Sequence, residues 1–581
     1  MIKRIYIITL YLSTIVGYLP RLNMTDEVII ESGLRSNGVI DITTLSDSSI
    51  AIGTGNGIGI GTFRDDKLIL TNLYSLNLPQ GGFPSVVSNN GFIAVSGVDD
   101  TLIFGDSLPK GTGISYSFDL GESWQYFSQP KDPLPDVLSC PYSSNPNKYY
   151  QTSDSLLCEQ ECVYPFSCNE PEKNCVKIFD WISWGSQDSI RHLSTTVDIW
   201  NVSYNMSISD DYLYAASFTG GLRRLELSDT ANGDWEVVPL PMDNQQYLFC
   251  DQLDSIDYEY DVNDSCPINN NPCNDLNSNK CNPYLSGNMN HKVYSVYSIE
   301  DTLWVGTADG INKGVVNGDC IDWLHFNSDN SNLSGDWVVG FTTQETDGNQ
   351  FIYAVTWPTN EGEYSSISYS NNGGLLWEPV EQFKDYGIKV YELDADNARV
   401  YAATDKGLYV SDNGQYWEKF QRPVGNDGQQ ILSDKIYSVK SFDDGSKLIV
   451  GSDDGLAVTY DNGLSWDVYR SWEKNQSEEE ILFNPYPNPF YRKYSNTVGN
   501  NGYVRFIIYD NNPGSNNTSI DIYNFSMDKV VSLNSPVIVD DGIEFIWDGL
   551  NNYSMPVPNG TYFCRLNHKN KYSWTKLVVV N

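Results

Sequence analysis

The sequence has little positive charge and little histidine. Its 581 residues include 36 Lys and Arg against 75 Asp and Glu, which gives a formal net charge of −39, and only 4 are His. A chain with this charge repels phosphate backbones and anionic lipid head groups. We therefore expect neither nucleic acid nor a membrane surface among its partners. A solvated acidic surface fits an extracellular or saline setting.

Long apolar runs and helical periodicity are also scarce. The one long apolar run is N-terminal, where Lys3 and Arg4 precede residues 5–19, and this order is typical of a secretory signal peptide over residues 1–19. No A-x-A cleavage pattern follows it, so an uncleaved anchor is the alternative. No other run is long enough to cross a bilayer, so we expect no transmembrane helix after signal removal.

What the chain does have is glycine, aromatic residues and a repeat. The 46 Gly, 39 Tyr and 15 Trp stand among short apolar runs broken by Asn, Asp and Gly, which is typical of short strands joined by tight turns. Seven such runs end in Thr or Ser, and the last four ends lie about 48 residues apart, the period of a propeller blade. The sequence predicts an all-β fold, a seven-bladed β-propeller over residues 26–472. The seven run ends are Thr54, Ser96, Ser217, Thr307, Thr356, Thr404 and Ser452.

The repeat is interrupted on both sides of the third unit. The excess chain, at about 134–182 and 245–288, is rich in Asn, Asp, Ser and Pro and holds two groups of cysteines. In an exported chain these cysteines favour disulfides, and zinc binding is the weaker alternative because no paired C-x-x-C is present. Long insertions on a rigid scaffold are common recognition sites. The disulfide candidates are Cys140, Cys158, Cys162, Cys168, Cys175, Cys250, Cys266, Cys273, Cys281 and Cys320, with their pairing left open.

Four units carry the pattern S/T-x-D-x-G-x-x-W after their third strand. An Asp or Asn side chain can accept backbone N–H bonds across the turn, Gly supplies a positive φ, and Trp buries a large ring. We therefore interpret these residues as structural and expect no catalytic residue among them. They are Ser117, Asp119, Gly121 and Trp124; Ser370, Asn372, Gly374 and Trp377; Asp412, Gly414 and Trp417; and Thr459, Asp461, Gly463 and Trp466.

This pattern resembles the Asp-box (BNR) repeat, which occurs in sialidases, xyloglucan-active glycoside hydrolases, sortilin-type receptors and assembly factors of the YCF48 kind. The resemblance implies a fold and leaves the function open. A sialidase would need an R-I-P-type motif and three convergent Arg, but arginines are few and scattered here. A glycosidase with two carboxylates stays an alternative because acidic residues are abundant.

Residues 473–481 form a charged linker, and residues 482–581 predict a small Ig-like β-sandwich from five short apolar runs. The segments "NPYPNPF" at 484–490, "IEFIWDGLNNYSMPVPNGTYFCRL" at 543–566 and the final "TKLVVVN" resemble the C-terminal sorting domain of bacterial proteins exported by type IX secretion. Two expected glycines are missing, near residues 526–529 and at 554–555. The resemblance implies contact with that secretion machinery; a generic adhesive module is the alternative.

We expect an exported, non-enzymatic recognition propeller, secreted or at the outer-membrane surface, whose partner is a glycan or an extracellular protein. The alternatives are a secreted glycoside hydrolase and a purely structural surface component. No cofactor or metal is expected. Asx-rich turns at Asp394 and Asp443 offer oxygens for Ca²⁺ but lack a full binding loop, so turn chemistry explains them better. Whether residues 26–32 join the last blade is left open.

Overall fold

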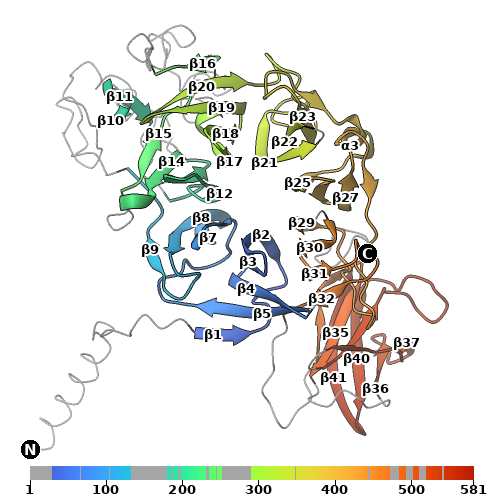
Figure 1. Cartoon of the computed structure of the whole chain (residues 1–581). Coiled ribbons are helices and arrows are strands. Elements are labelled where there is room, and N and C mark those ends of the chain that lie inside the picture. The colour runs from blue at the N-terminus through green and yellow to red at the C-terminus, as the bar shows by residue number, and fades with distance from the viewer. Residues whose placement is uncertain are drawn as a thin grey trace, which may run out of the picture.

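The structure is a computed structural model. It describes residues 29–132, 179–250 and 289–580, apart from gaps at 66, 104, 185–186, 194–197, 230–233, 242, 244, 347, 443–444, 472–482, 493–501, 510–517 and 540–541. Seven antiparallel sheets follow one another around a common axis (Figure 1). The predicted all-β propeller is therefore confirmed. The signal peptide predicted for residues 1–19 and the linker at 473–481 lie outside the described residues.

Each blade is a meander whose first strand lies nearest the axis. From the inner strand outwards, blade one has β2 (Val39–Ser46), β3 (Ser49–Thr54), β4 (Gly57–Arg64), β5 (Lys67–Tyr74) and β1 (Ile29–Ser32); blade two has β6 (Val86–Asn89), β7 (Phe92–Ile103), β8 (Asp106–Ser117) and β9 (Gln125–Phe127); blade three has β12 (Ser203–Ile208), β13 (Tyr212–Ser217), β14 (Gly221–Glu226) and β15 (Glu236–Val238).

Blade four has β17 (Val293–Ile299), β18 (Thr302–Thr307), β19 (Gly310–Asn317), β20 (Cys320–Phe326) and β16 (Tyr247–Leu248). Blade five has β21 (Trp337–Thr346), β22 (Asn349–Trp357), β23 (Ser366–Ser370) and β24 (Glu378–Pro379). Blade six has β25 (Val390–Ala395), β26 (Val400–Thr404), β27 (Gly407–Ser411) and β28 (Glu418–Lys419), and blade seven has β29 (Ile436–Phe442), β30 (Lys447–Ser452), β31 (Gly455–Thr459) and β32 (Asp467–Tyr469).

The repeated Thr or Ser lies in the second strand of each blade and is buried in all seven. In four blades its hydroxyl donates to the carbonyl three residues later, as Thr404 does to Gly407 at 2.6 Å and Ser452 to Gly455 at 2.8 Å. Because the hydroxyl donates a hydrogen bond to the turn carbonyl, that carbonyl needs no water molecule as a partner. The repeat found in the sequence is thus a turn device that each blade reuses.

The first and last blades close the ring without sharing a strand. β1 pairs with β5 of blade one, and blade seven takes its outer strand from its own chain, β32. Asn37 joins the two ends, because its Nδ2 donates to the carbonyl of Ser471 at 3.0 Å and its Oδ1 accepts from the Ser471 N–H at 2.7 Å. Apolar residues of blades one and seven, including Ile50 and Ile449, bury a shared core. The open question about residues 26–32 is therefore settled for β1: it extends blade one.

The remaining described elements lie outside the seven blades or between their strands. Two sheets form the C-terminal sandwich and enclose an aromatic core with Phe506 and Phe545. One sheet has β33 (Phe483–Tyr486), β35 (Val504–Tyr509), β39 (Gly542–Trp547) and β38 (Val537–Val539); the other has β34 (Phe490–Tyr491), β41 (Lys571–Val580), β40 (Gly560–His568), β36 (Thr518–Tyr523) and β37 (Lys529–Leu533). The rest are the hairpin β10 (Phe179–Trp184) and β11 (Gln187–Leu193), α3 (Glu381–Tyr386), η2 (Leu227–Asp229) and η6 (Met289–His291).

Candidate functional site

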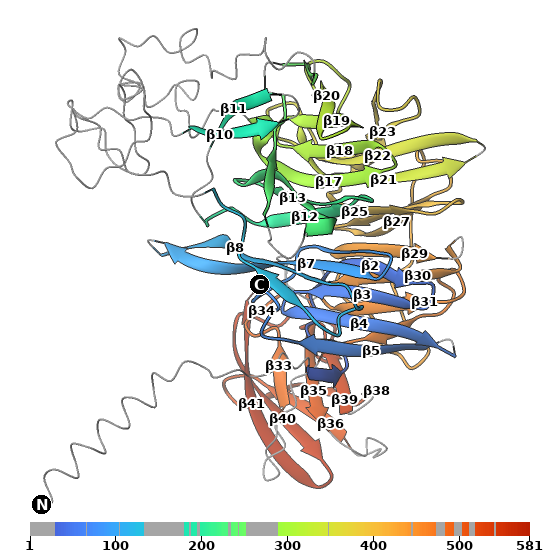
Figure 2. The ribbon, with the colours of Figure 1, turned by 60° about the vertical axis from the view of Figure 1, so that its left-hand side comes forward.

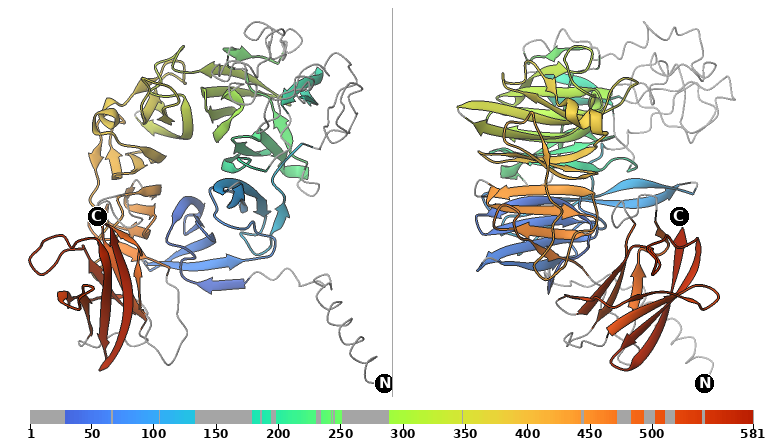
Figure 3. Two further views of the ribbon diagram at one scale, coloured as in Figure 1. Left: turned by 180° about the vertical axis from the view of Figure 1, so that it is seen from behind. Right: turned by 90° about the vertical axis from the view of Figure 1, so that its right-hand side faces the viewer.

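The two insertions join the propeller at one face, and two hairpins lie at the same face. All inner strands start at this face, and the turn between the second and third strand of each antiparallel blade returns to it. Residues 128–202, between β9 and β12, and residues 239–292, between β15 and β17, therefore both join the ring here. The long hairpin of β7 and β8 extends on the same side, as does the β10–β11 hairpin (Figures 2 and 3). We call this the insertion face.

The second insertion is fixed to blade four at its start. β16 pairs with β20, with Leu248 opposite Trp323, and a disulfide joins Cys250 to Cys320. The Cys250 N–H also donates to Asp322 Oδ1 at 2.8 Å. Residues 245–250, which the sequence placed within the insertion, thus belong structurally to blade four. The predicted disulfide is confirmed for these two cysteines.

A carboxylate holds the two ends of this insertion together. Asp243 accepts the backbone N–H groups of Met289 at 2.9 Å and Asn290 at 2.8 Å, and the Asn290 side chain donates to the carbonyl of Pro241 at 2.8 Å. Asp243, before the insertion, and Met289, after it, therefore lie at one point of the propeller. Because both ends are fixed, whatever the loop presents is presented from a defined place on the insertion face.

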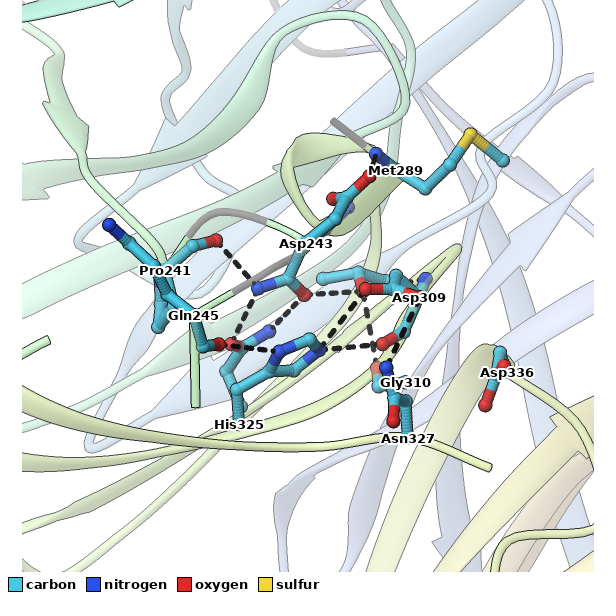
Figure 4. Close-up of polar contacts among 12 residues, drawn as sticks. Pro241, Asp243, Gln245, Met289, Asp309, Gly310, His325, Asn327 and Asp336 are labelled. Atoms are coloured by element: carbon cyan, nitrogen blue, oxygen red, sulfur yellow. Dashed lines mark hydrogen bonds and ion pairs between the residues drawn. The ribbon is translucent and has the colours of Figure 1, made fainter. Parts of the chain in front are cut away.

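Below this point, His325 and Asp309 lie side by side (Figure 4). His325 Nδ1 lies 3.0 Å from the carbonyl of Gln245 and Nε2 lies 2.7 Å from the carbonyl of Asp309, while the Asp309 Oδ2 atom is 3.5 Å from Nε2. Carbonyl oxygens only accept hydrogen bonds, so both ring nitrogens face acceptors. His325 thereby links the start of the insertion to the β18–β19 turn.

Burial, together with the nearby carboxyls of Asp243 and Asp336, raises the pKa of Asp309 to about 8. Burial also raises the pKa of Asp336, against hydrogen bonds from Ser328. Glu363 differs: burial opposes its ionisation, but hydrogen bonds such as the one from Thr359 N at 2.7 Å lower its pKa. Neighbouring carboxyls with pKa values pushed in opposite directions are a feature of acid–base sites as well as of structural clusters.

In the described ranges, no group of three or more His, Cys, Asp or Glu side chains is arranged to hold a metal ion. Asp394, one of the two residues considered for calcium, pairs with Lys440 at 2.6 Å and accepts the Ser441 N–H at 2.7 Å. Its oxygens therefore serve an inter-blade ion pair. Asp443 lies outside the described residues.

The repeated turn residues lie at the opposite face from the insertions, between the third and fourth strands. In blade two the Asp119 carboxylate accepts from Ser117 Oγ at 2.7 Å and from Ser123 N at 2.8 Å, and Trp124 donates to the Gly121 carbonyl at 3.1 Å. The hydrogen bonds to the Asp or Asn side chain recur at Asn372 and Asp461, and the Trp-to-Gly bond recurs only in blade six, from Trp417 to Gly414, among the described residues. Trp124, Trp377, Trp417 and Trp466 are all buried.

One assignment in blade six is wrong. Asn413, rather than Asp412, accepts the N–H groups of Gln415 and Tyr416 across the turn, both at 3.0 Å. Asp412 is 80% exposed and pairs with Arg399 at 3.0 Å. The turn of this blade is one residue shorter than the others, so the Asn directly before Gly414 takes the accepting position. Aligning the blades on the Gly and Trp rather than on the preceding Ser produced the error, because Asn413 lies two residues after Ser411 as Asp119 lies two after Ser117.

The other cysteine predictions divide by location. Cys140, Cys158, Cys162, Cys168, Cys175, Cys266, Cys273 and Cys281 lie outside the described residues. Cys564 is a free, buried thiol in the C-terminal sandwich. Within the described ranges, no helix combines the length and apolar character needed to cross a membrane.

The sequence did not single out Asp243, Asp309 or His325. Asp309 stands in the turn "TADG", which the repeat explains as a turn, and His325 lies in an ordinary outer strand. The contacts of Asp243 with Met289 and of His325 with Gln245 depend on where the insertion joins the ring, which no local pattern encodes. The one available signal was His325 itself, since only four histidines occur in the chain.

No protein family and no curated protein matches the sequence. Three solved structures illustrate the similar folds. PorZ, a surface component of the type IX secretion system of Porphyromonas gingivalis, is 12% identical with a TM-score of 0.29, over 92% of this chain and 64% of PorZ. YCF48 bound to D1 peptide is 12% identical with a TM-score of 0.36, over 78% of this chain and 100% of YCF48. An ancestral GH74 enzyme is 11% identical with a TM-score of 0.42, over 96% of this chain and 64% of the enzyme.

Proposed function

We propose that this protein is an exported, non-enzymatic recognition propeller that binds a glycan or an extracellular protein with its insertion face. The observation that carries the proposal is the fixed base of the second insertion: a strand, the Cys250–Cys320 disulfide and the Asp243 contacts all hold it on one face. Binding loops held on a rigid scaffold lose little entropy when a ligand is bound.

In the proposed organisation, residues 1–19 are a signal peptide, 26–472 a propeller built from Asp-box repeats, 473–481 a linker and 482–581 a type IX sorting domain. The protein then acts in the medium or at the outer-membrane surface. The two-sheet sandwich with its YPNPF-containing first strands supports this reading. Deleting residues from 484 onward should leave the chain in the periplasm; unchanged surface display of that variant would refute the sorting role.

The recognition role is tested by replacing residues 252–287 with a short Gly-Ser linker. This variant keeps Cys250, Asp243 and Met289, so the base of the insertion stays intact. We expect wild-type protein to bind a component of an array of glycans and secreted proteins, and the variant to lose at least tenfold in affinity with an unchanged thermal midpoint. Equal binding by both proteins would exclude the second insertion from recognition.

A glycoside hydrolase is the second function that an observation favours. A carboxyl that stays protonated at neutral pH is what a general acid needs, and burial raises the pKa of Asp309 to about 8 beside the carboxyl of Asp336. In this case an Asp309→Asn variant should lose all polysaccharide hydrolysis that the wild-type protein shows. If wild-type protein releases no reducing ends from any polysaccharide, this second function is refuted.

A further inference from the structure

A second repeated pattern lies at the start of the inner strands. The sequence Lys-Val/Ile-Tyr opens blades four, six and seven, and blade three has Tyr204 at the equivalent place. The blade fold does not explain the tyrosine or the lysine, because the buried position between them, Val or Ile, supplies the core contact. The three copies are Lys292-Val293-Tyr294, Lys389-Val390-Tyr391 and Lys435-Ile436-Tyr437.

Each of these tyrosines is the extra residue of a β-bulge. In blade six, Val390 pairs with Thr404 and Glu392 with Ala403, which leaves Tyr391 unpaired. Tyr204, Tyr294 and Tyr437 are skipped in the same way in their blades. A bulge changes the direction of a side chain relative to the regular alternation along the strand, and bulges often occur next to functional sites. The bulge recurs in six blades at the start of the inner strand, and in four of them its extra residue is a tyrosine.

The exposed rings form a continuous series over five blades. Tyr204 lies 5.8 Å from Tyr294, which lies 4.7 Å from Trp337, measured between ring centroids. The series continues through Trp357, Tyr391 and Tyr437 with steps of 5.5, 6.3 and 5.3 Å. All six rings are partly exposed. We call Tyr204, Tyr294, Trp337, Trp357, Tyr391 and Tyr437 the rim aromatics.

The rim also carries polar groups that can bind a ligand. Across the described ranges, the hydroxyls of the four rim tyrosines have no hydrogen-bond partner. Burial raises the pKa of Tyr204 and of Tyr437 to about 12, so both hydroxyls stay protonated and can donate. Lys389 lies over the Trp357 ring with Nζ 3.6 Å from its centroid, a cation–π contact that holds the ammonium at the rim.

Charge at the rim is balanced. Burial lowers the pKa values of Lys292 and Lys389. The negative charges of Asp243 and Asp405, respectively, oppose this shift. Asp453 likewise interacts with Lys435. Three ammonium groups therefore face three carboxyls in a protein whose net charge is −39. Such a rim gives an acidic ligand no net attraction, whereas an uncharged polar ligand meets donors and acceptors without repulsion.

The backbone of the inner strands is not available to an extended peptide. Side chains of the preceding blade already accept its N–H groups: Asn205 accepts that of Val296 at 2.9 Å, and Asp394 accepts that of Ser441 at 2.7 Å. A peptide could not add as a further strand at this edge, which is the mode that gives peptides affinity for sheets. Partly exposed aromatic rings with surrounding hydroxyl, ammonium and carboxyl groups instead match the apolar C–H faces and hydroxyls of sugars.

We propose that the rim aromatics bind an uncharged glycan chain, with successive sugars stacked along the series of rings. This inference rests on the proposed recognition function and specifies its ligand class. Trp337 and Tyr391 stand on either side of Trp357 near the middle of the series. Loss of either ring should break the row of contacts. Trp337 is paired in register with Trp357, and only Tyr391 is the extra residue of a bulge.

The test uses the full chain and immobilised oligosaccharides of at least six sugars. The array holds neutral glucans, mannans, xylans and galactans, acidic polygalacturonate and alginate, and unfolded peptides. The neutral glycan with the strongest signal is then titrated by calorimetry. We expect Trp337→Ala and Tyr391→Ala each to weaken its binding at least tenfold, and Tyr391→Phe, which keeps the ring and removes the hydroxyl, to weaken it by about threefold or less.

Tyr416→Ala is the matched control. This tyrosine is 76% exposed and lies in the β27–β28 turn at the opposite face, so its loss should leave affinity unchanged. Neutral-glycan binding that survives both rim substitutions, or binding limited to acidic glycans or peptides, would overturn the rim assignment and leave the recognition function standing. Absence of binding to any glycan, peptide or protein would overturn both. Circular dichroism of each variant verifies that it is folded.

Discussion

Arg505 of the C-terminal sandwich and Asp454 of blade seven form a buried ion pair between the two parts of the chain. Nη2 of Arg505 lies 2.6 Å from Oδ2 of Asp454 and 2.8 Å from the carbonyl of Gln430. Glu544 completes the cluster by contacting Arg505 and lying 3.6 Å from Arg470. The charges of two arginines and two carboxylates thus balance one another. These contacts hold the sandwich against blade seven of the propeller.

Removing one member of this cluster should be costly. Arg505→Ala leaves the buried Asp454 and Glu544 carboxylates with one arginine between them, and unbalanced buried charge typically costs about 3–5 kcal/mol. We expect Arg505→Ala to lower the denaturation midpoint and to speed proteolysis between residues 472 and 482, measured by limited digestion. Lys571→Ala, at the start of β41, is the control. Unchanged digestion of Arg505→Ala would show that the ion pair does not hold the two parts together.

In the turn of blade six, the neighbouring side chains of Asp412 and Asn413 have different roles, so their substitution should have different effects on stability. Asn413→Ala removes the acceptor of two backbone N–H groups and should destabilise the protein by about 1–3 kcal/mol. Asp412→Ala removes only an exposed pair with Arg399 and should cost less than about 1 kcal/mol. Urea denaturation followed by tryptophan fluorescence measures both. A larger loss for Asp412→Ala than for Asn413→Ala would contradict the hydrogen bonds described here.

The Cys250–Cys320 disulfide closes a loop with a sequence separation of 70. Chain-entropy arguments assign about 4 kcal/mol to a loop of this length. We expect the Cys250→Ser, Cys320→Ser double variant to lose stability and to become sensitive to protease within residues 251–288, while blade six keeps its hydrogen-exchange protection. Equal protease sensitivity of the wild-type and double-variant loops would show that the disulfide does not restrain the insertion.

Asp309 should make stability depend on pH. Its pKa is raised from 3.8 to about 8 in the folded protein, so the folded state binds the proton more tightly than the unfolded state. Folding is therefore favoured below about pH 4 by this group, and that contribution is lost as the pH rises toward 8. Asp309→Asn should flatten the pH dependence of the urea midpoint between about pH 5 and 8.

The control for this pH effect is Asp412→Asn, whose side chain is 80% exposed. It should leave the wild-type slope unchanged. A slope that survives in Asp309→Asn would place the titrating group elsewhere, for example at Asp453, where burial raises the pKa to about 7, or at Asp41, where burial raises it to about 6.

The fold followed from the sequence because its signals are local and repeated. In four blades a Thr or Ser of the second strand donates to the carbonyl three residues later, and in four blades a Trp three residues after a Gly is buried. Both act within one hairpin, so spacing alone reveals them. The error at Asp412 arose where one turn is a residue shorter, which a fixed spacing cannot detect.

The candidate site was only partly predictable. The insertions were visible as interruptions of the period, but His325 meets the carbonyl of Gln245, 80 residues earlier in the chain, only because the start of the second insertion lies against blade four. Contacts of this kind join residues far apart in the chain. Three of the four rim tyrosines were present in the sequence as a repeated Lys-x-Tyr, yet their shared position at a bulge became clear only from the strand register.

The most direct test of the recognition function measures binding and hydrolysis together. Full-length protein is passed over each polysaccharide of the array, and both retention and newly formed reducing ends are quantified after prolonged incubation. We predict retention on a neutral glycan, lost in Trp337→Ala, with no increase in reducing ends. Release of reducing ends by the wild-type protein, abolished in Asp309→Asn, would contradict the recognition account and establish the enzyme in its place.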